Sequence, residues 1–147
     1  MSKSSLANAL KKVLSNSYVL YAKTQNYHWN VTGPNFLSLH TLFESQYEDL
    51  AAATDRVAEL IRTLGEKTPG TLKFYINHTS IFEGNENLSP TEMVKDLLSS
   101  QDAILNVLKS ALEEAEKASD SVIADALVER MAIHRKNKWI LESISTL

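Results

Sequence analysis

The sequence predicts an all-α protein: a four-helix bundle with a short extra helix in the long connection between its second and third helices. Apolar residues recur at the three- and four-residue spacing of an amphipathic helix over four stretches. Each stretch has about 25 residues, well beyond the roughly 11 of an average helix. Two links between the stretches are short and one is long, the connectivity of a bundle with one crossover.

The first two helices are separated by a turn signal. The first is expected from about residue 4 to Asn30, where the sequence Val31-Thr32-Gly33-Pro34 ends it. The second is expected from Asn35 or Phe36 to Leu64, because Gly65 is a natural C-terminal stop. With so short a link, the two helices are expected to be antiparallel neighbours.

The other two helices follow a long connection. The third is expected to open at Ser89-Pro90, because serine caps a helix and proline fits its first position, and to fade near Lys117. The fourth is expected from Asp120 to Ile144. The connection Glu66–Leu88 is long for a structureless loop, so residues 71–76 are expected to form a short helix within it.

Composition excludes several classes of protein. The 147 residues predict one domain, 1–147, and they include no cysteine, which excludes disulfides, thiolate metal sites and cysteine nucleophiles. No secretory signal and no membrane span are recognised, so a cytoplasmic protein is expected. The net charge of -3 and the pI of about 5.8 argue against a dedicated nucleic-acid binder, which usually has a basic face.

One histidine lies on each side of the first turn, within NYHWNVTGPNFLSLHTLFE, residues 26–44. His28 lies a few residues before the turn and His40 a similar distance after it. In an antiparallel helix pair these two positions come level. His28 also shares a helix face with apolar residues, so its side chain is expected to point inward.

The second helix carries an acidic stripe beside His40. At about 100° per residue, Glu44, Asp55 and Glu59 fall within about 100° of it. Imidazole and carboxylate bind divalent metals such as iron, manganese and zinc. His40 and Glu44 form one end of the stripe, and Asp55 and Glu59 form the other. About 22 Å separates the two ends, which is too far for one metal ion to bind both. Either another helix of the chain completes each end, or an antiparallel second subunit does. A two-fold axis gives the second arrangement twice, which predicts a symmetric dimer.

Each of these residues also has an ordinary explanation. An inward histidine is commonly a hydrogen-bonded core residue, and acids at four-residue spacing are commonly solvated. Glu48 and Asp49 are expected to be such surface charges. His78, in the long connection, is expected at the surface, and His134 is expected to pack in the core without binding a metal.

The stretch from Asn26 to His40 resembles the Dps family, the DNA-protection-during-starvation proteins or mini-ferritins. Asp55-Arg-Val-Ala-Glu59 and Leu64-Gly65 extend the likeness. It covers nearly the whole chain, including Thr68–Leu72 and Trp139. The resemblance implies a ferritin-like subunit, a hollow dodecamer built from two-fold dimers, and iron stored as mineral.

The resemblance also implies a ferroxidase site between two subunits, with a di-iron centre that cycles between Fe(II) and Fe(III). One subunit would supply His28, His40 and Glu44, and its partner Asp55 and Glu59. Glu44 stands where the family often has aspartate, so its longer side chain is expected to alter the second iron position. No histidine follows a glutamate by three residues, which argues against the Glu-x-x-His sites of other di-iron bundles.

Further expectations follow from the resemblance. In the family, the tryptophan at the position of Trp29 sits next to the site and is proposed to take up stray oxidising equivalents. Packing at the helix end explains Trp29 as well. Hydrogen peroxide is the family's preferred oxidant. Iron would enter through an acidic pore at a three-fold axis, lined by Asp120 and Asp125. Asp120 fits a helix cap as well.

DNA binding is expected to be weak or absent. Phosphate contacts come from lysine and arginine, and this sequence has an acidic balance and no lysine-rich segment before its first helix. Within the cytoplasm, association with the nucleoid is an open alternative. Two other functions also stay open: a DNA-compacting architectural protein with little oxidase activity, and a metal-free helical interaction protein that dimerises through its second helix. Neither accounts for the histidines and acids together.

Overall fold

The computed structural model describes residues 2–145, so both ends of the expected domain, Met1 and Leu147, lie outside the described residues. Within that range the protein consists of helices and connections, with no strand. The helices are α1 (Ser2–Asn30), α2 (Phe36–Thr63), α3 (Leu72–His78), α4 (Pro90–Lys117) and α5 (Ser121–Ser145). The predicted fold class is confirmed, and the helix boundaries lie within about two residues of those expected, the usual uncertainty of helix ends.

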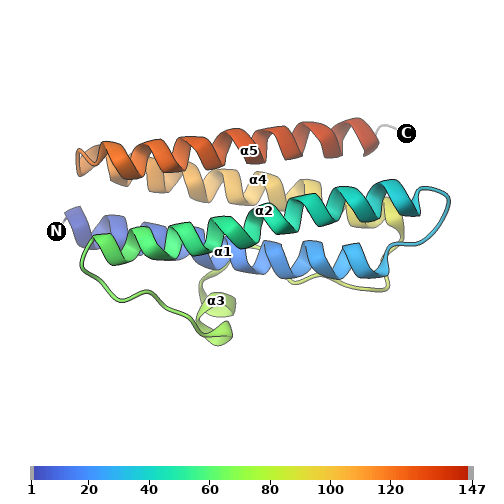
Figure 1. Ribbon diagram of the computed structural model, residues 1–147, viewed down its shortest axis with the longest axis horizontal. Helices are drawn as coiled ribbons and strands as arrows, with labels where there is room; N and C mark the ends of the chain where they lie inside the picture. The colour runs from blue at the N-terminus through green and yellow to red at the C-terminus, as the bar shows by residue number, and fades with distance from the viewer. Residues whose placement is uncertain (1, 146–147) are drawn as a thin grey trace.

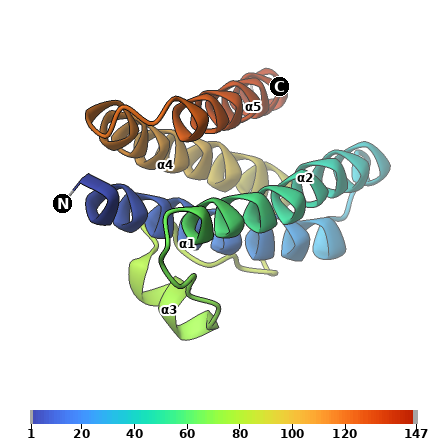
Figure 2. The same ribbon diagram turned by 60° about the vertical axis from the view of Figure 1, so that its left-hand side comes forward.

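The four long helices lie side by side, and α3 sits outside them against α1 (Figures 1 and 2). α1 and α2 form one antiparallel pair, and α4 and α5 form the other. The crossover runs back along the bundle, so α4 begins at the same end as α2. The α1–α2 turn therefore meets the start of α4, where Gly33 lies close to Pro90.

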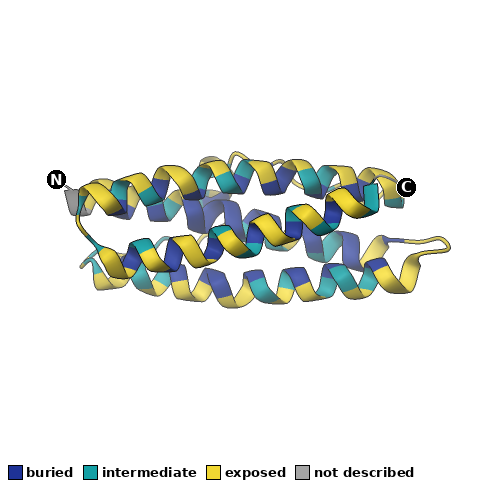
Figure 3. Ribbon diagram, turned by 90° about the horizontal axis from the view of Figure 1, so that it is seen from above, coloured by how far each residue is buried: buried dark blue, intermediate teal, exposed yellow. Residues whose placement is uncertain are grey.

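The core fills the space between the two helix pairs (Figure 3). On α2 the buried positions recur every three or four residues, apart from the adjacent pair Ala53 and Thr54, which is the pattern of a helix with one buried face. They are Leu39, Phe43, Gln46, Leu50, Ala53, Thr54, Val57 and Ile61. The opposite face of α2 is exposed, which leaves room there for functional side chains.

Local sequence signals set the helix ends. Ser89 Oγ accepts from the Glu92 backbone at 3.2 Å and caps α4. Thr71 Oγ1 accepts from the Phe74 backbone at 3.2 Å and caps α3. Gly65 follows α2 with a φ of 88°, a left-handed conformation that glycine adopts without strain.

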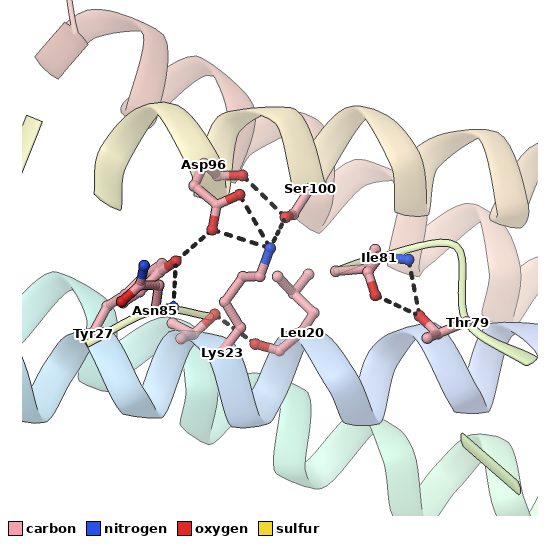
Figure 4. A network of polar contacts seen from close by, with 9 residues as sticks. Leu20, Lys23, Tyr27, Thr79, Ile81, Asn85, Asp96 and Ser100 are labelled. Atoms are coloured by element: carbon pink, nitrogen blue, oxygen red, sulfur yellow. Dashed lines mark hydrogen bonds and ion pairs between the residues drawn. The ribbon is translucent and has the colours of Figure 1, made fainter. Parts of the chain in front are cut away.

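A buried polar network ties the crossover to α1 and α4 (Figure 4). Lys23, with 3% of its surface exposed, donates to Asp96 and to Ser100 Oγ, both at 3.1 Å. Tyr27 also donates to Asp96, and its hydroxyl accepts from the backbone of Asn85 at 3.3 Å. Burial and the bond to Asp96 raise the pKa of the Tyr27 phenol. The ion pair therefore also positions a tyrosine that anchors the crossover.

None of the helices in the described residues is both long enough and apolar enough to cross a membrane.

Candidate metal centre

The two predicted histidines meet across the turn between α1 and α2. His28 lies in the last turn of α1 and His40 in the second turn of α2. Their rings stack with centroids 3.8 Å apart and 14° between the planes. His28 is buried, with 7% of its surface exposed, and His40 is half-buried. The structure thus brings the two side chains level, as the short turn between two antiparallel helices predicts.

Reciprocal hydrogen bonds fix the tautomer of both neutral rings. His28 Nδ1 lies 2.8 Å from the carbonyl oxygen of His40, and His40 Nδ1 lies 2.7 Å from the carbonyl oxygen of His28. A carbonyl oxygen only accepts, so each Nδ1 carries a proton and donates it. In the neutral rings both Nε2 atoms therefore keep a free lone pair. A backbone carbonyl that orients a histidine in this way is a usual support of a metal ligand.

The helix end explains why these bonds form. The last four carbonyls of a helix have no partner within it, and the His28 carbonyl is one of these in α1. His40 reaches across the turn from α2 and satisfies that oxygen. Phe36 stacks on His40 with centroids 5.0 Å apart and holds the ring in place. Gly33, with a φ of 100°, permits the tight turn that brings the helices together.

The acidic residues lie farther along α2. Glu44 is one turn after His40 and half-buried, whereas Asp55 and Glu59 are exposed. Because α2 is continuous, the separation of about 22 Å between the ends of the stripe stands. In the part of the chain that the structure describes, no three histidine or acidic side chains are grouped to hold a metal ion. One chain thus assembles the histidine pair without the distant acids.

Glu44, Asp55 and Glu59 differ from the nearby Asp49 because they form no ion pair within the described residues. Asp49, expected to be a surface charge, instead accepts two bonds from Arg130, at 3.1 and 2.9 Å. Among the side chains described, no cation pairs with Glu44, Asp55 or Glu59. Their oxygens are therefore free to bind a ligand from outside this chain.

His134 is a packed histidine, as predicted. It is fully buried, donates from Nδ1 to Gln101 Oε1 at 2.7 Å and accepts at Nε2 from Arg130 at 3.1 Å. Burial lowers the pKa of its imidazole to about 3, and the Arg130 cation acts in the same direction. Both ring nitrogens are occupied, so His134 offers no lone pair to a metal. His78 is exposed on α3, also as expected.

The structure gives Asp120 a local role. Its Oδ1 accepts from the Ile123 backbone at 3.0 Å, so this carboxylate caps the start of α5. Asp125 is exposed near the start of α5. Within the described residues, neither aspartate belongs to a group of three or more histidine or acidic side chains that could hold a metal ion. Trp29 is 65% exposed and adjoins His28 in the sequence. The pore and the role of Trp29 stay predictions.

Sequence reasoning missed Tyr47, which packs against the histidine pair. Its ring meets that of His28 edge-on, with centroids 5.1 Å apart. The signal was present, because Tyr47 follows His40 by seven residues and therefore lies on the same face of α2.

Known proteins are similar to this chain in both architecture and sequence. A family model described as a ferritin-like domain matches residues 7–147. The DNA protection during starvation protein of Brevibacillus brevis is 35% identical over 138 residues, which cover 94% of this chain and 93% of that protein. A crystal structure of a Dps protein from Bacillus brevis superposes with a TM-score of 0.94 at 34% identity, over 97% of this chain and 96% of that one.

A third relative connects the fold to a type of site. The Dps protein of Vibrio cholerae, described as a member of a broad superfamily of ferritin-like diiron-carboxylate proteins, is 29% identical. Its structure superposes with a TM-score of 0.92, over 97% of this chain and 89% of that one. The fold, the matched length and these identities agree, and the chain belongs to the Dps family of ferritin-like proteins.

Proposed function

We propose that this protein oxidises Fe(II) to Fe(III) at sites shared between two subunits and stores the iron as mineral in a hollow dodecameric shell. It would thereby protect the cell and its DNA from oxidative damage. The observation that carries the proposal is the His28–His40 pair, whose reciprocal bonds leave both Nε2 atoms free. The description of the Vibrio cholerae relative as a diiron-carboxylate protein supports iron as the metal.

An antiparallel second subunit would complete each site. It would bring its Asp55 and Glu59 to the first subunit's His28, His40 and Glu44, and the two-fold axis would create the same site again at the other end. In this arrangement, residues that lie about 22 Å apart along one α2 helix contribute to the same site from two different subunits. It also gives partners to three acids that have none within the described chain.

Each side chain has a distinct part in the proposed reaction. His28 and His40 would bind Fe(II) as neutral ligands through Nε2, with their orientation held by the carbonyls. Asp55 and Glu59 would hold the more firmly bound iron, and Glu59 is long enough to bridge. Carboxylates favour Fe(III), because the more highly charged ion gains more from anionic oxygen. The acids would thus drive the oxidation forward.

Hydrogen peroxide is the proposed oxidant. Two Fe(II) ions each give one electron, the O–O bond breaks, and two protons from solvent complete two water molecules. Because both electrons arrive together, no hydroxyl radical is released. Iron would enter through an acidic pore that includes Asp125, with the cap residue Asp120 beside it. The proposed location is the cytoplasm, and DNA would be protected chiefly by removal of iron and peroxide.

The test compares carboxylates inside and outside the proposed site. Fe(II) is added anaerobically, peroxide is injected, and Fe(III) absorbance is followed in the wild type and in Asp55→Ala/Glu59→Ala. The control is Glu113→Ala/Glu116→Ala, which removes the same charge from exposed positions on α4. Fast oxidation that is lost only in the first variant supports the site. Equal rates in all three would remove the stripe from catalysis.

A mixing experiment tests whether the site is shared. The Asp55→Ala/Glu59→Ala chain keeps its histidines, and a His28→Ala/His40→Ala chain keeps its acids, so each alone should be inactive. With equal amounts of the two chains, random co-assembly makes half of the dimers mixed. In each mixed dimer one of the two sites has both its histidines and its acids, and the other has neither. About a quarter of the wild-type activity should therefore return. No return of activity on mixing would mean that each site is built within one chain.

A further inference from the structure

A continuous series of aromatic rings leads away from the histidine pair. Beyond Tyr47, Tyr21 follows with centroids 5.8 Å apart, and Tyr18 lies 5.9 Å from Tyr21. Tyr75 stacks on Tyr18 at 4.6 Å. All these separations fall within the range of about 4.5–7 Å for directly packed rings. With the 5.1 Å contact between Tyr47 and His28, the series is unbroken from the site to α3.

The series gathers four of the five tyrosines of the chain, although they come from three helices. Tyr47 lies on α2, Tyr18 and Tyr21 lie on α1, and Tyr75 lies on α3. The remaining tyrosine, Tyr27, belongs to the Lys23–Asp96 network and contacts none of these rings among the described residues.

Exposure along the series suits a redox role. Tyr47, Tyr21 and Tyr18 are half-buried, so a phenol proton can pass to solvent when the ring loses an electron. Tyr75 is buried, and its hydroxyl donates to the carbonyl of Pro69 at 2.8 Å, an oxygen that cannot take up the proton. An oxidised ring is therefore best accommodated before Tyr75. Tyr18 and Tyr75 both line a cavity of about 310 Å³ between α1 and α3.

We propose that Tyr47, Tyr21 and Tyr18 form a relay that carries single oxidising equivalents away from the histidine pair. This inference rests on the proposed function, in which peroxide is reduced at that pair. It concerns a site that holds only one Fe(II). Such a site can supply one electron, whereas peroxide requires two, and the second would come from Tyr47.

The reaction balances with one iron and one tyrosine. Fe(II) and the phenol each give one electron, the O–O bond of peroxide breaks, and the phenol proton together with one solvent proton completes two water molecules. The products are Fe(III), water and a neutral tyrosyl radical, which passes to Tyr21 and Tyr18 by exchange of an electron and a proton. A later Fe(II) gives one electron, and with a solvent proton the phenol is restored.

The rings have an ordinary alternative role in packing. Aromatic pairs of this kind stabilise a fold by about 0.5–1.5 kcal/mol each. Tyrosine to phenylalanine separates the two roles, because it keeps the ring and its contacts and removes the oxidisable hydroxyl. Packing alone predicts that such variants behave as the wild type in every redox measurement.

The experiment detects the radical directly. The assembled wild-type protein is loaded anaerobically with one Fe(II) per histidine pair, mixed with one equivalent of hydrogen peroxide and freeze-quenched for electron paramagnetic resonance. Protein with ring-deuterated tyrosine is treated in parallel, because deuteration narrows a tyrosyl spectrum and leaves a tryptophanyl spectrum from Trp29 unchanged. The variants are Tyr47→Phe and Tyr21→Phe, with Tyr27→Phe as the matched control.

The wild type and Tyr27→Phe should give a tyrosyl signal that deuteration narrows. Tyr47→Phe should lose most of it, and Tyr21→Phe should confine the remaining radical to Tyr47. A signal that Tyr47→Phe leaves unchanged, or a spectrum unaffected by deuteration, overturns the relay. Fe(III) absorbance in the same samples separates the two proposals. Fe(III) formed without a tyrosyl radical overturns the relay alone, whereas no Fe(III) even with excess Fe(II) overturns both.

Discussion

His28 and His40 hold each other through the backbone: each imidazole donates from Nδ1 to the carbonyl oxygen of the other residue, at 2.8 and 2.7 Å. The two rings stack at 3.8 Å. Each residue therefore acts both as a possible metal ligand and as the support that orients the other. Loss of either histidine should weaken metal binding by more than the loss of one nitrogen.

The first prediction concerns this mutual support. His40→Phe keeps a ring beside His28 and Phe36 but removes Nε2 and the donor to the His28 carbonyl. Loss of an orienting partner alone costs about 10–100-fold in metal affinity, so Fe(II) affinity should fall by at least about 10-fold. Anaerobic equilibrium dialysis measures it. His78→Phe is the control, because His78 also stacks on a phenylalanine, at 3.8 Å, but lies outside the site. Equal affinities in both variants would contradict the assignment.

The second prediction separates the two roles of Asp120. Asp120→Ala removes the cap of α5 and should lower the free energy of unfolding by about 0.5–2 kcal/mol. Asp120→Asn keeps an oxygen that can accept from Ile123, so stability should be nearly retained while the charge is lost. If the pore is acidic as proposed, iron uptake should slow in Asp120→Asn and in Asp125→Asn. Normal uptake in both would leave Asp120 as a cap only.

The third prediction is a pH dependence from His134. The pKa of this imidazole is about 3 in the folded protein and 6.5 in a free histidine. Between these values the unfolded chain binds the additional proton, so stability is full above pH 6.5 and falls as the pH drops, by about 1.4 kcal/mol per unit from this group. Urea unfolding at fixed protein concentration measures it. His134→Gln should flatten the slope between pH 6.5 and 4.5, and an unchanged slope would exclude His134 as its source.

The fourth prediction is an asymmetry in the network of Figure 4. Asp96→Ala leaves the buried Lys23 ammonium without its counter-charge, with only the Ser100 hydroxyl among the described residues to accept from it, and should cost about 3 kcal/mol or more in stability. Lys23→Met leaves a carboxylate whose side chain is 32% exposed and still bonded to Tyr27, so its cost should be smaller. Thermal unfolding compares the two. Equal losses would mean that desolvation of the lysine does not control the stability of the network.

The fifth prediction concerns DNA. Lys11, Lys23, Arg56, Arg130, Lys117 and Lys138 are already paired with acids of the same chain. The other lysines and arginines belong to a chain with a net charge of -3, and this acidic balance opposes binding to phosphates. A gel shift with duplex DNA at physiological salt should give no retarded band. Near-stoichiometric binding at low salt that disappears as salt is raised would instead favour the DNA-compacting alternative.

Much of the fold followed from local patterns. Each long helix carries its own apolar periodicity, and Gly33, Gly65 and the Ser89-Pro90 pair mark ends that depend on a few neighbouring residues. The sequence also predicts that His28 and His40 lie side by side, because a short turn fixes the alignment of two antiparallel helices. The structure agrees with sequence reasoning where a feature depends on one helix or on one turn.

Other features depend on residues far apart in the chain. The sequence predicts a solvated surface charge at Asp49, yet Asp49 pairs with Arg130, 81 residues away. Lys23 reaches Asp96 across 73 residues, and the aromatic series joins three helices. Periodicity tells which side of a helix a residue occupies, but not which neighbour it meets there. These pairings are set by how the helices pack.

The sequence by itself determined four long helices, the short turn and the presence of two histidines and three acids on suitable faces. Only the tertiary structure decided which histidine nitrogens are free. The reason is that the tautomer of a neutral ring follows its hydrogen-bond partner, and here each partner is a carbonyl on the neighbouring helix. Tertiary packing thus leaves both Nε2 atoms free to bind a metal.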